Sequence, residues 1–231
     1  MTDSAYDPAC REPTIVAGGD RRSALWRRRL FEAEAGLTRF VVESRAGAFM
    51  HELLHVKHAI FESLPRAGAG ESDWKAAFFR AQALMEQFVV SRFGHDQLAA
   101  WAAANSAVYA AVDAAPRHDA AVPLQRLHDQ ADLYRSEVEW VERDESRAVL
   151  KIRHCAIWDY RELARRRGVT ITLQSPCEYC VPATTAMITN KGLRARCELT
   201  DGEHGHGCLW TASGQSPGHD TGQGTAQGGE D

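Results

Sequence analysis

The residue type best suited to chemistry in this sequence is cysteine, because five of the six cysteines fall between Cys155 and Cys208. In a reducing compartment such residues act as thiols, metal ligands or nucleophiles rather than as a disulfide framework. Cys177 and Cys180 are three residues apart and therefore share one face of a helical turn. Since a helix N-terminus favours the thiolate form of a cysteine, Cys177 is the leading candidate nucleophile and Cys155 is the second.

Histidines and carboxylates close to these cysteines supply the proton-transfer groups that a thiol nucleophile needs. The candidate bases are His154, His204 and His206. A carboxylate, either Asp159 or Glu178, would orient the base or assist the proton transfer. The catalytic set predicted from the sequence is Cys177, Cys155, Asp159, Glu178 and His154.

A structural zinc site is the second interpretation of the same cysteines. Four thiolates complete the tetrahedron that Zn²⁺ prefers, and the candidate ligands are Cys177, Cys180, Cys197 and Cys208. If the last two strands pair around a turn centred near residues 202–203, Cys208 lies opposite Cys197 and their side chains share one sheet face. In a third interpretation Cys155, Cys197 and Cys208 are small buried residues of a core. The sequence alone leaves the three interpretations open.

A second group of potential ligands begins with the pentapeptide from His51 to His55, which has the form H-E-x-x-H. On a helix this spacing places two imidazoles on one face, where they can bind zinc. His58 and Glu62 fall on the same stripe, so the alternative metal ligands are His51, His55, His58 and Glu62. The downstream pattern of a zinc protease is missing, which excludes that class. A polar helix face and the wall of a substrate pocket are the other interpretations.

Helices are expected before the cysteine-rich stretch, and short strands within it. Apolar residues recur at spacings of three and four between Arg21 and Asp113, which predicts four helices, one of them capped at Ser72-Asp73. The pattern then becomes β-prone from Arg135. The elements expected there are a hairpin with strands at 138–141 and 148–152, a helix at 157–167, a helix from after Pro176 to Ile188, a strand at 193–199 and a last strand ending near Trp210. The fold class is therefore α+β, with an N-terminal helical bundle followed by a small antiparallel sheet with two helices.

The expected organisation has four parts. These are a disordered N-terminus at 1–20, a helical region at 21–134, a cysteine-rich α+β region at 135–212 and a disordered tail at 213–231. The composition, with 44% hydrophobic residues and a formal net charge of −4, is that of an ordinary globular protein. It implies no nucleic-acid partner. Since no apolar run is long enough for a membrane span and no signal peptide is visible, we expect a cytoplasmic protein without a membrane partner.

Motifs in the last third of the chain resemble those of the L-2-amino-thiazoline-4-carboxylate hydrolase family. The resemblance covers about residues 135–212 and is carried by the segments 137–140, 154–160, 161–168, 177–178 and 200–210. It implies a helical front part and a small sheet with three separated cysteines, whose places Cys155, Cys177 and Cys208 occupy. Where the family pattern has an acidic residue, this chain has Cys180. That departure favours metal or redox chemistry over an unchanged hydrolase activity.

The resemblance implies hydrolytic opening of a cyclic amidine by cleavage of a C–N bond. We therefore expect a small-molecule hydrolase, or a related ring-opening or ring-forming enzyme of specialised metabolism, with a cysteine nucleophile and a small-molecule substrate. It would work with no cofactor or with zinc. The alternatives are a zinc-binding accessory or ligand-binding protein and a metalloenzyme that uses the His51 stripe. A protein partner or a homo-oligomer is compatible with either.

Overall fold

The computed structural model describes residues 18–44, 47–112, 118–202 and 205–214. Within these ranges the fold is α+β, as expected, with a helical bundle followed by a four-stranded antiparallel sheet and two further helices. The helices are α1 (Gly18–Glu43), α2 (Met50–Glu62), α3 (Glu71–Phe93), α4 (Leu98–Val112), α5 (Ala121–Tyr134), α6 (Ala156–Arg166) and α7 (Cys177–Thr189). The strands are β1 (Glu137–Arg143), β2 (Arg147–His154), β3 (Arg194–Gly202) and β4 (Gly205–Ser213).

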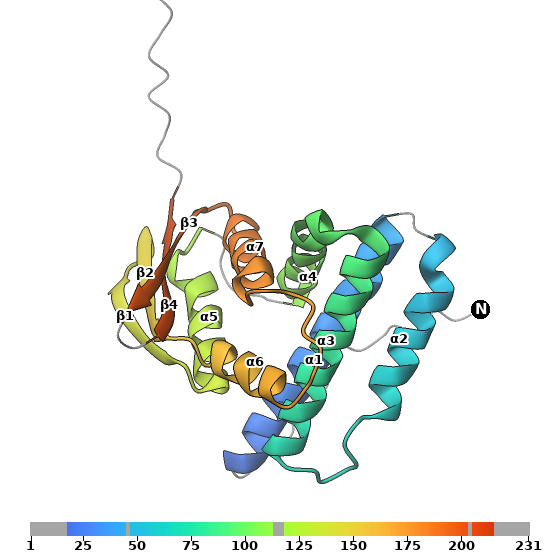
Figure 1. The fold of residues 1–231 in the computed structure, drawn as a ribbon. Helices are drawn as coiled ribbons and strands as arrows, with labels where there is room; N and C mark the ends of the chain where they lie inside the picture. The colour runs from blue at the N-terminus through green and yellow to red at the C-terminus, as the bar shows by residue number, and fades with distance from the viewer. Residues whose placement is uncertain (1–17, 45–46, 113–117, 203–204, 215–231) are drawn as a thin grey trace, which may run out of the picture.

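The sheet has the strand order β1-β2-β4-β3, and the described helices lie on one of its faces (Figure 1). In Figure 1 the sheet lies at one side of the molecule, α5 and α7 lie against it, α1, α3 and α4 form the next layer and α2 lies at the far side. The covered face presents alternate residues of β2 and β4, such as Leu150 and Trp210, to the apolar side of α5. The other face is polar, with Glu139 bound to Arg153 through two hydrogen bonds. One core therefore joins the sheet to α5 and α7.

A second core fills the helical bundle. Trp26, Leu30 and Leu37 on α1 are fully buried, as is Trp101 on α4. The two helices approach closely at Gly36, because a Cβ there would lie 1.5 Å from the side-chain oxygen of Asn105. None of the described helices is long and apolar enough to cross a membrane.

The ends of several elements differ from the sequence expectation. Helix α3 begins at Glu71 rather than after Ser72-Asp73, and the Asp73 carboxylate accepts a hydrogen bond from the Gly70 amide at 3.3 Å. A side chain one turn inside the helix therefore provides the cap. The N- and C-terminal segments expected to be disordered lie mostly outside the described residues, although α1 begins at Gly18 and β4 continues to Ser213.

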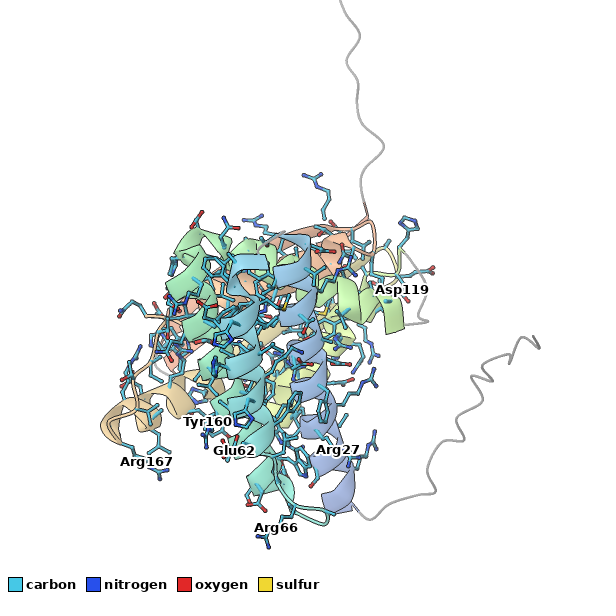
Figure 2. All side chains as sticks on the ribbon, turned by 90° about the vertical axis from the view of Figure 1, so that its right-hand side faces the viewer. Arg27, Glu62, Arg66, Asp119, Tyr160 and Arg167 are labelled. Atoms are coloured by element: carbon cyan, nitrogen blue, oxygen red, sulfur yellow. The ribbon has the colours of Figure 1, made fainter. Side chains whose placement is uncertain are left out.

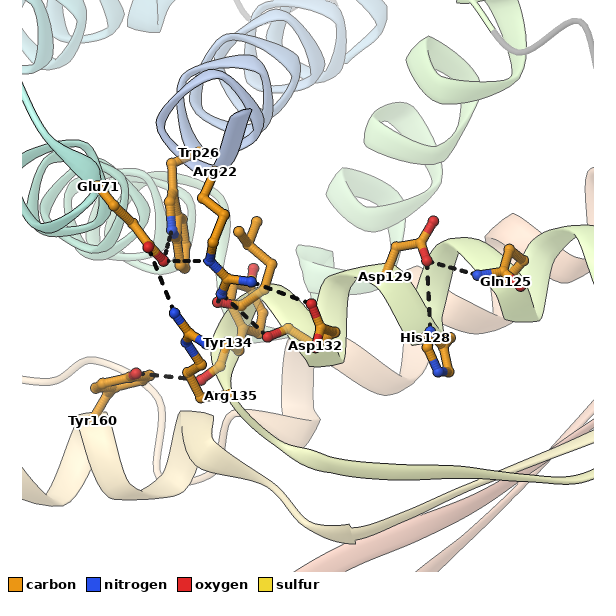
Figure 3. Close-up of polar contacts among 11 residues, drawn as sticks. Arg22, Trp26, Glu71, Gln125, His128, Asp129, Asp132, Tyr134, Arg135 and Tyr160 are labelled. Atoms are coloured by element: carbon orange, nitrogen blue, oxygen red, sulfur yellow. Dashed lines mark hydrogen bonds and ion pairs between the residues drawn. The ribbon is translucent and has the colours of Figure 1, made fainter. Parts of the chain in front are cut away.

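A polar network ties α1, α3 and α5 together (Figure 3). The Glu71 carboxylate accepts hydrogen bonds from the Arg22 guanidinium at 2.7 Å and from the Trp26 indole at 3.4 Å. Arg135, just after α5, lies 3.6 Å from the same carboxylate, and Arg22 also binds Asp132 on α5 at 3.2 Å. These contacts set the position of α5. The sheet and the cysteine-rich segment in turn pack against α5.

Candidate functional site

The five described cysteines line one small pocket between the sheet, α5 and the start of α7. These residues are Cys155, Cys177, Cys180, Cys197 and Cys208. All five are free thiols with partly buried side chains. The rest of the lining is mainly apolar and includes Trp158 and Trp210. The fold therefore brings together every described cysteine that the sequence singled out.

Two helix N-termini meet at this pocket. Cys155 precedes α6, and the backbone N–H groups of Ile157 and Trp158 point at its thiol. Cys177 is the first residue of α7. Helix N-termini carry a partial positive charge, so they stabilise negative charge beside them. Cys177 therefore lies at the helix start that its spacing predicted, and Cys155 lies just before the start of α6.

Two hydrogen bonds of Ser175 hold the turn that leads into α7. The Ser175 hydroxyl accepts a hydrogen bond from the Cys177 amide at 3.0 Å, and the Glu178 carboxylate accepts one from the Ser175 amide at 2.6 Å. The S-x-x-E spacing of these residues is typical of a helix start, and it was not among the predicted signals. Glu178, which we had expected to assist proton transfer, also pairs with His95, just before α4. It therefore fixes the helix that carries Cys177.

The pairing of β3 with β4 corrects the expected register. Cys197 lies opposite Trp210, and Cys208 lies opposite Leu199. The turn is centred one residue later than expected, midway between the paired residues Gly202 and Gly205, which moves each partner by two positions. Since side chains alternate with a period of two, Cys197 and Cys208 still share one face of the sheet. They are diagonal neighbours rather than a directly opposed pair.

Gly207 permits the close approach of β4 to the end of β2. A Cβ at this position would lie 2.4 Å from the carbonyl oxygen of Ile152 and 2.9 Å from that of Arg153. Beyond this point the Cys155 amide donates to the His206 carbonyl at 2.8 Å. The glycine therefore brings Cys155 and Cys208 to the same pocket.

Most thiols of the pocket resist ionisation. Burial raises the pKa of Cys180 to about 12 and that of Cys197 to about 11. It also raises the pKa of Cys208 and of Cys155, and for Cys155 the N–H groups of Ile157 and Trp158 act in the opposite direction. Negative charge on neighbouring thiols adds to each increase. More than one thiolate would therefore need a compensating cation.

A histidine–aspartate pair lies beside the pocket on the same sheet face. Asp201 and His206 are directly paired on β3 and β4, and the His206 Nδ1 lies 2.6 Å from an Asp201 carboxylate oxygen. The His206 ring stacks on Trp158, a pocket residue, with centroids 3.9 Å apart. Because a carboxylate only accepts hydrogen bonds, Nδ1 carries the proton and Nε2 of the neutral ring is the basic nitrogen. Asp201 is a partner that the expected register did not provide.

The other predicted acid–base residues take different places. The His154 Nε2 lies 2.6 Å from the Asp159 carboxylate, which is 60% exposed. This pair is at the start of α6, on the outer side of Cys155. His154 and Asp159 therefore contact each other, and both are close to Cys155 in the sequence. His204 lies outside the described residues.

A much larger cavity adjoins the thiol pocket. It has a volume of about 640 Å³ and lies among α1, α3, α5, α6, α7 and the segment 167–172. Gln130, Tyr134, Ile157, Pro176 and Cys180 line both spaces. The volume is typical of sites for small organic ligands. Cys180 therefore stands between a space for a ligand and the remaining thiols.

The His51 stripe is a separate feature on the outer face of α2. The two imidazoles of His51 and His55 are 2.9 Å apart at their Nε2 atoms, and His58 lies 3.8 Å from Glu62. Helix α2 is on the side of the molecule opposite the sheet (Figure 1), and Figure 2 shows it in front with Glu62 near its end. The four side chains are exposed and share a stripe, as predicted. The fold keeps them away from the cysteines.

The sulfur atoms of the thiol pocket are ligands of the type that bind a soft or borderline cation such as Zn²⁺. In the part of the chain that the structure describes, however, no three His, Cys, Asp or Glu side chains are arranged to hold one ion. Zinc binding by Cys177, Cys180, Cys197 and Cys208 would therefore require these side chains to rotate toward a common centre.

Comparison with known proteins gives no match. No family model fits the sequence, and no curated protein or solved structure is significantly similar to it. The resemblance to the amino-thiazoline-carboxylate hydrolases therefore depends on the motifs of residues 135–212 alone.

Proposed function

We propose that the protein is a cytoplasmic enzyme that opens or forms a C–N bond in a small heterocyclic molecule, with a pocket cysteine as nucleophile. The observation that carries this proposal is the convergence of five thiols and two helix N-termini on one pocket beside a ligand-sized cavity. Cys177 is the proposed nucleophile and Cys155 is the second candidate. In the cytosol these thiols remain reduced.

In the proposed reaction the Cys177 sulfur attacks the amidine carbon, forming a C–S bond and a tetrahedral adduct. The C–N bond of the ring then breaks, and its electron pair leaves with the nitrogen, which takes up a proton. In the proposal the imidazolium form of His206, held by Asp201, supplies that proton. A water molecule next attacks the same carbon and gives a proton back to His206, the C–S bond breaks and the Cys177 thiolate is regenerated.

His206 acts on the leaving group or on water rather than on the nucleophile. Its ring stacks on Trp158, which lines the same pocket as Cys177, and the proposed reaction has a substrate atom or a water molecule between the ring and that thiol. Asp201→Asn keeps the hydrogen-bond geometry but favours the other tautomer of His206, so turnover falls by about 100-fold or more if this pair transfers the proton.

Turnover of a panel of cyclic amidines, followed as loss of substrate by mass spectrometry, tests the proposal. Wild-type protein should consume at least one member, and Cys177→Ser should abolish consumption while the far-ultraviolet circular dichroism spectrum stays unchanged. Val141→Ala, a change at an exposed residue of β1 that lines neither the thiol pocket nor the cavity, is the matched control. Full activity of Cys177→Ser and Cys155→Ser would rule out cysteine catalysis.

A zinc-binding accessory protein is the second candidate function. The observation that favours it is the mutual effect of the thiols, which hinder one another's ionisation and would be stabilised by a divalent cation. This candidate predicts about one zinc per chain by elemental analysis. The metal would be lost from Cys180→Ser and Cys197→Ser together with the fold. Metal-free protein with unchanged stability would exclude it.

A further inference from the structure

The charges that line the large cavity are unbalanced. Four arginines and one glutamate are among its lining residues, namely Arg29, Arg80, Arg161, Arg167 and Glu86. Glu86 is neutralised by Arg161, whose guanidinium lies 3.3 Å from it and also donates to the Leu173 carbonyl at 2.7 Å. The cavity therefore has excess positive charge in a mainly apolar wall.

Arg29 is the arginine of this set whose position is least explained by the fold. Its Nε is buried and has no hydrogen-bond partner. Its guanidinium lies over the rings of Phe78 and Tyr134, at 5.6 Å and 5.4 Å. Among the described residues its neighbour on α1, Glu32, is already paired with Arg28 and Arg126, each at 2.8 Å.

Burial would lower the pKa of Arg29, but Tyr134, Tyr109 and Glu32 outweigh that effect and hold it above its ordinary value, so the guanidinium stays charged although no carboxylate pairs with it directly. Aromatic faces compensate for part of the hydration lost on burial. A planar guanidinium binds carboxylate, sulfonate or phosphate groups through paired hydrogen bonds. The volume of the cavity is also large enough for a ligand much larger than one five-membered ring.

We infer that the cavity binds an organic anion that has a large apolar part. Its acidic group binds Arg29, and its apolar part extends toward Cys180. The inference deepens the proposed function, since it names the substrate class that would reach the thiols. Binding itself requires no thiol chemistry. The exposed Arg80, together with Arg167 at the surface end of α6 (Figure 2), lies at the rim and attracts the anion without orienting it.

Two fluorescent probes of nearly equal shape test this inference. Anilinonaphthalenesulfonate carries an anionic group, whereas N-phenyl-1-naphthylamine is the same ring system without it. Fluorescence titration of the wild-type protein should show that the anionic probe binds about tenfold or more tightly. Arg29→Gln should remove this preference, while Arg80→Gln, an equal change of charge at the rim, should retain most of it.

A cavity-filling change gives a test that does not depend on Arg29. Ala83→Trp, on the α3 wall of the cavity, should weaken the binding of both probes by about tenfold or more. Thermal unfolding of each variant checks that the probes report on folded protein. Equal binding of the two probes to the wild type would overturn the inference, and so would loss of the preference in Arg80→Gln or unaltered binding to Ala83→Trp.

The outcome is separable from that of the proposed function. Cys177→Ser should bind both probes as the wild type does, because the thiol does not hold the anion. If probe binding follows the expected pattern and no cyclic amidine is consumed, the proposed reaction fails and the binding site stands. If turnover occurs but the probes show no preference, the inference about the anion fails alone.

Discussion

At the scale of single residues, the thiols of the pocket differ in their capacity to ionise. Cys180 is the clearest case, because burial raises its pKa to about 12 from an ordinary value of about 8.5. The folded state therefore binds this proton more strongly than the unfolded state does. The contribution to stability is complete below the ordinary pKa and is lost as the pH rises toward 12.

The unfolding free energy should thus fall with pH above about 8.5, at up to about 1.4 kcal/mol per pH unit for this one group. Urea unfolding at several pH values between 8 and 11 measures the slope. Cys180→Ala removes the titrating group and should give a shallower slope than the wild type. An identical slope in both proteins would contradict the assignment.

Residue spacing alone predicted part of the site. Placing Cys177 and Cys180 on the first turn of one helix required only a period of 3.6, and the structure has this arrangement. The pairing of Asp201 with His206 was missed because the turn was centred one residue too early. An error of that size changes every cross-strand partner, although it preserved the shared face of the two strand cysteines.

At the scale of elements, Gly207 determines how closely β4 can approach β2. Gly207→Ala should destabilise the protein by about 1–3 kcal/mol, because the added Cβ would meet the Ile152 carbonyl oxygen at 2.4 Å. Gly214→Ala is the matched control at the end of the same sheet, where the nearest atom is 3.9 Å away. Chemical denaturation measures both variants. Equal stability of the two would mean that the strands are not in close contact at this point.

The Glu71 network should contribute measurably to the stability of the helical bundle. Partial burial would by itself raise the pKa of Glu71, but Arg22, Trp26 and Arg135 outweigh that effect and hold the pKa below its usual range. The stabilisation is therefore present above about pH 4.3, the ordinary value, and is lost as the pH falls through the lowered pKa.

Glu71→Gln should lower the unfolding free energy at pH 7 by about 1–2 kcal/mol, and the difference from the wild type should shrink in acid. Glu43→Gln breaks an exposed pair with Arg39 and should cost about 0.5 kcal/mol or less. Urea unfolding at pH 7 and pH 3 makes the comparison. A loss that is equal at both pH values would show that the network does not act through its charge.

At the scale of the whole molecule, the site depends on contacts between the two cores. Helix α7 belongs to both, since Ile188 packs against the sheet while the Tyr179 ring packs at a tilt on Trp101 of α4, with centroids 4.5 Å apart. The cavity has walls from α1, α3, α5, α6 and α7, which are far apart in the chain. Periodicity identified the helices but contained no information about which faces meet. The place of Arg29 on the cavity wall could therefore not be predicted from its spacing.

The central claim is that a nucleophilic cysteine and an anion-binding cavity form one site. An iodoacetamide that carries a naphthalenesulfonate group tests it directly, with plain iodoacetamide as reference and peptide mapping by mass spectrometry as readout. The account predicts that Cys177 reacts first and about tenfold or more faster with the sulfonate reagent, and that Arg29→Gln removes this acceleration. Equal rates with the two reagents, or acceleration that survives in Arg29→Gln, would contradict the account.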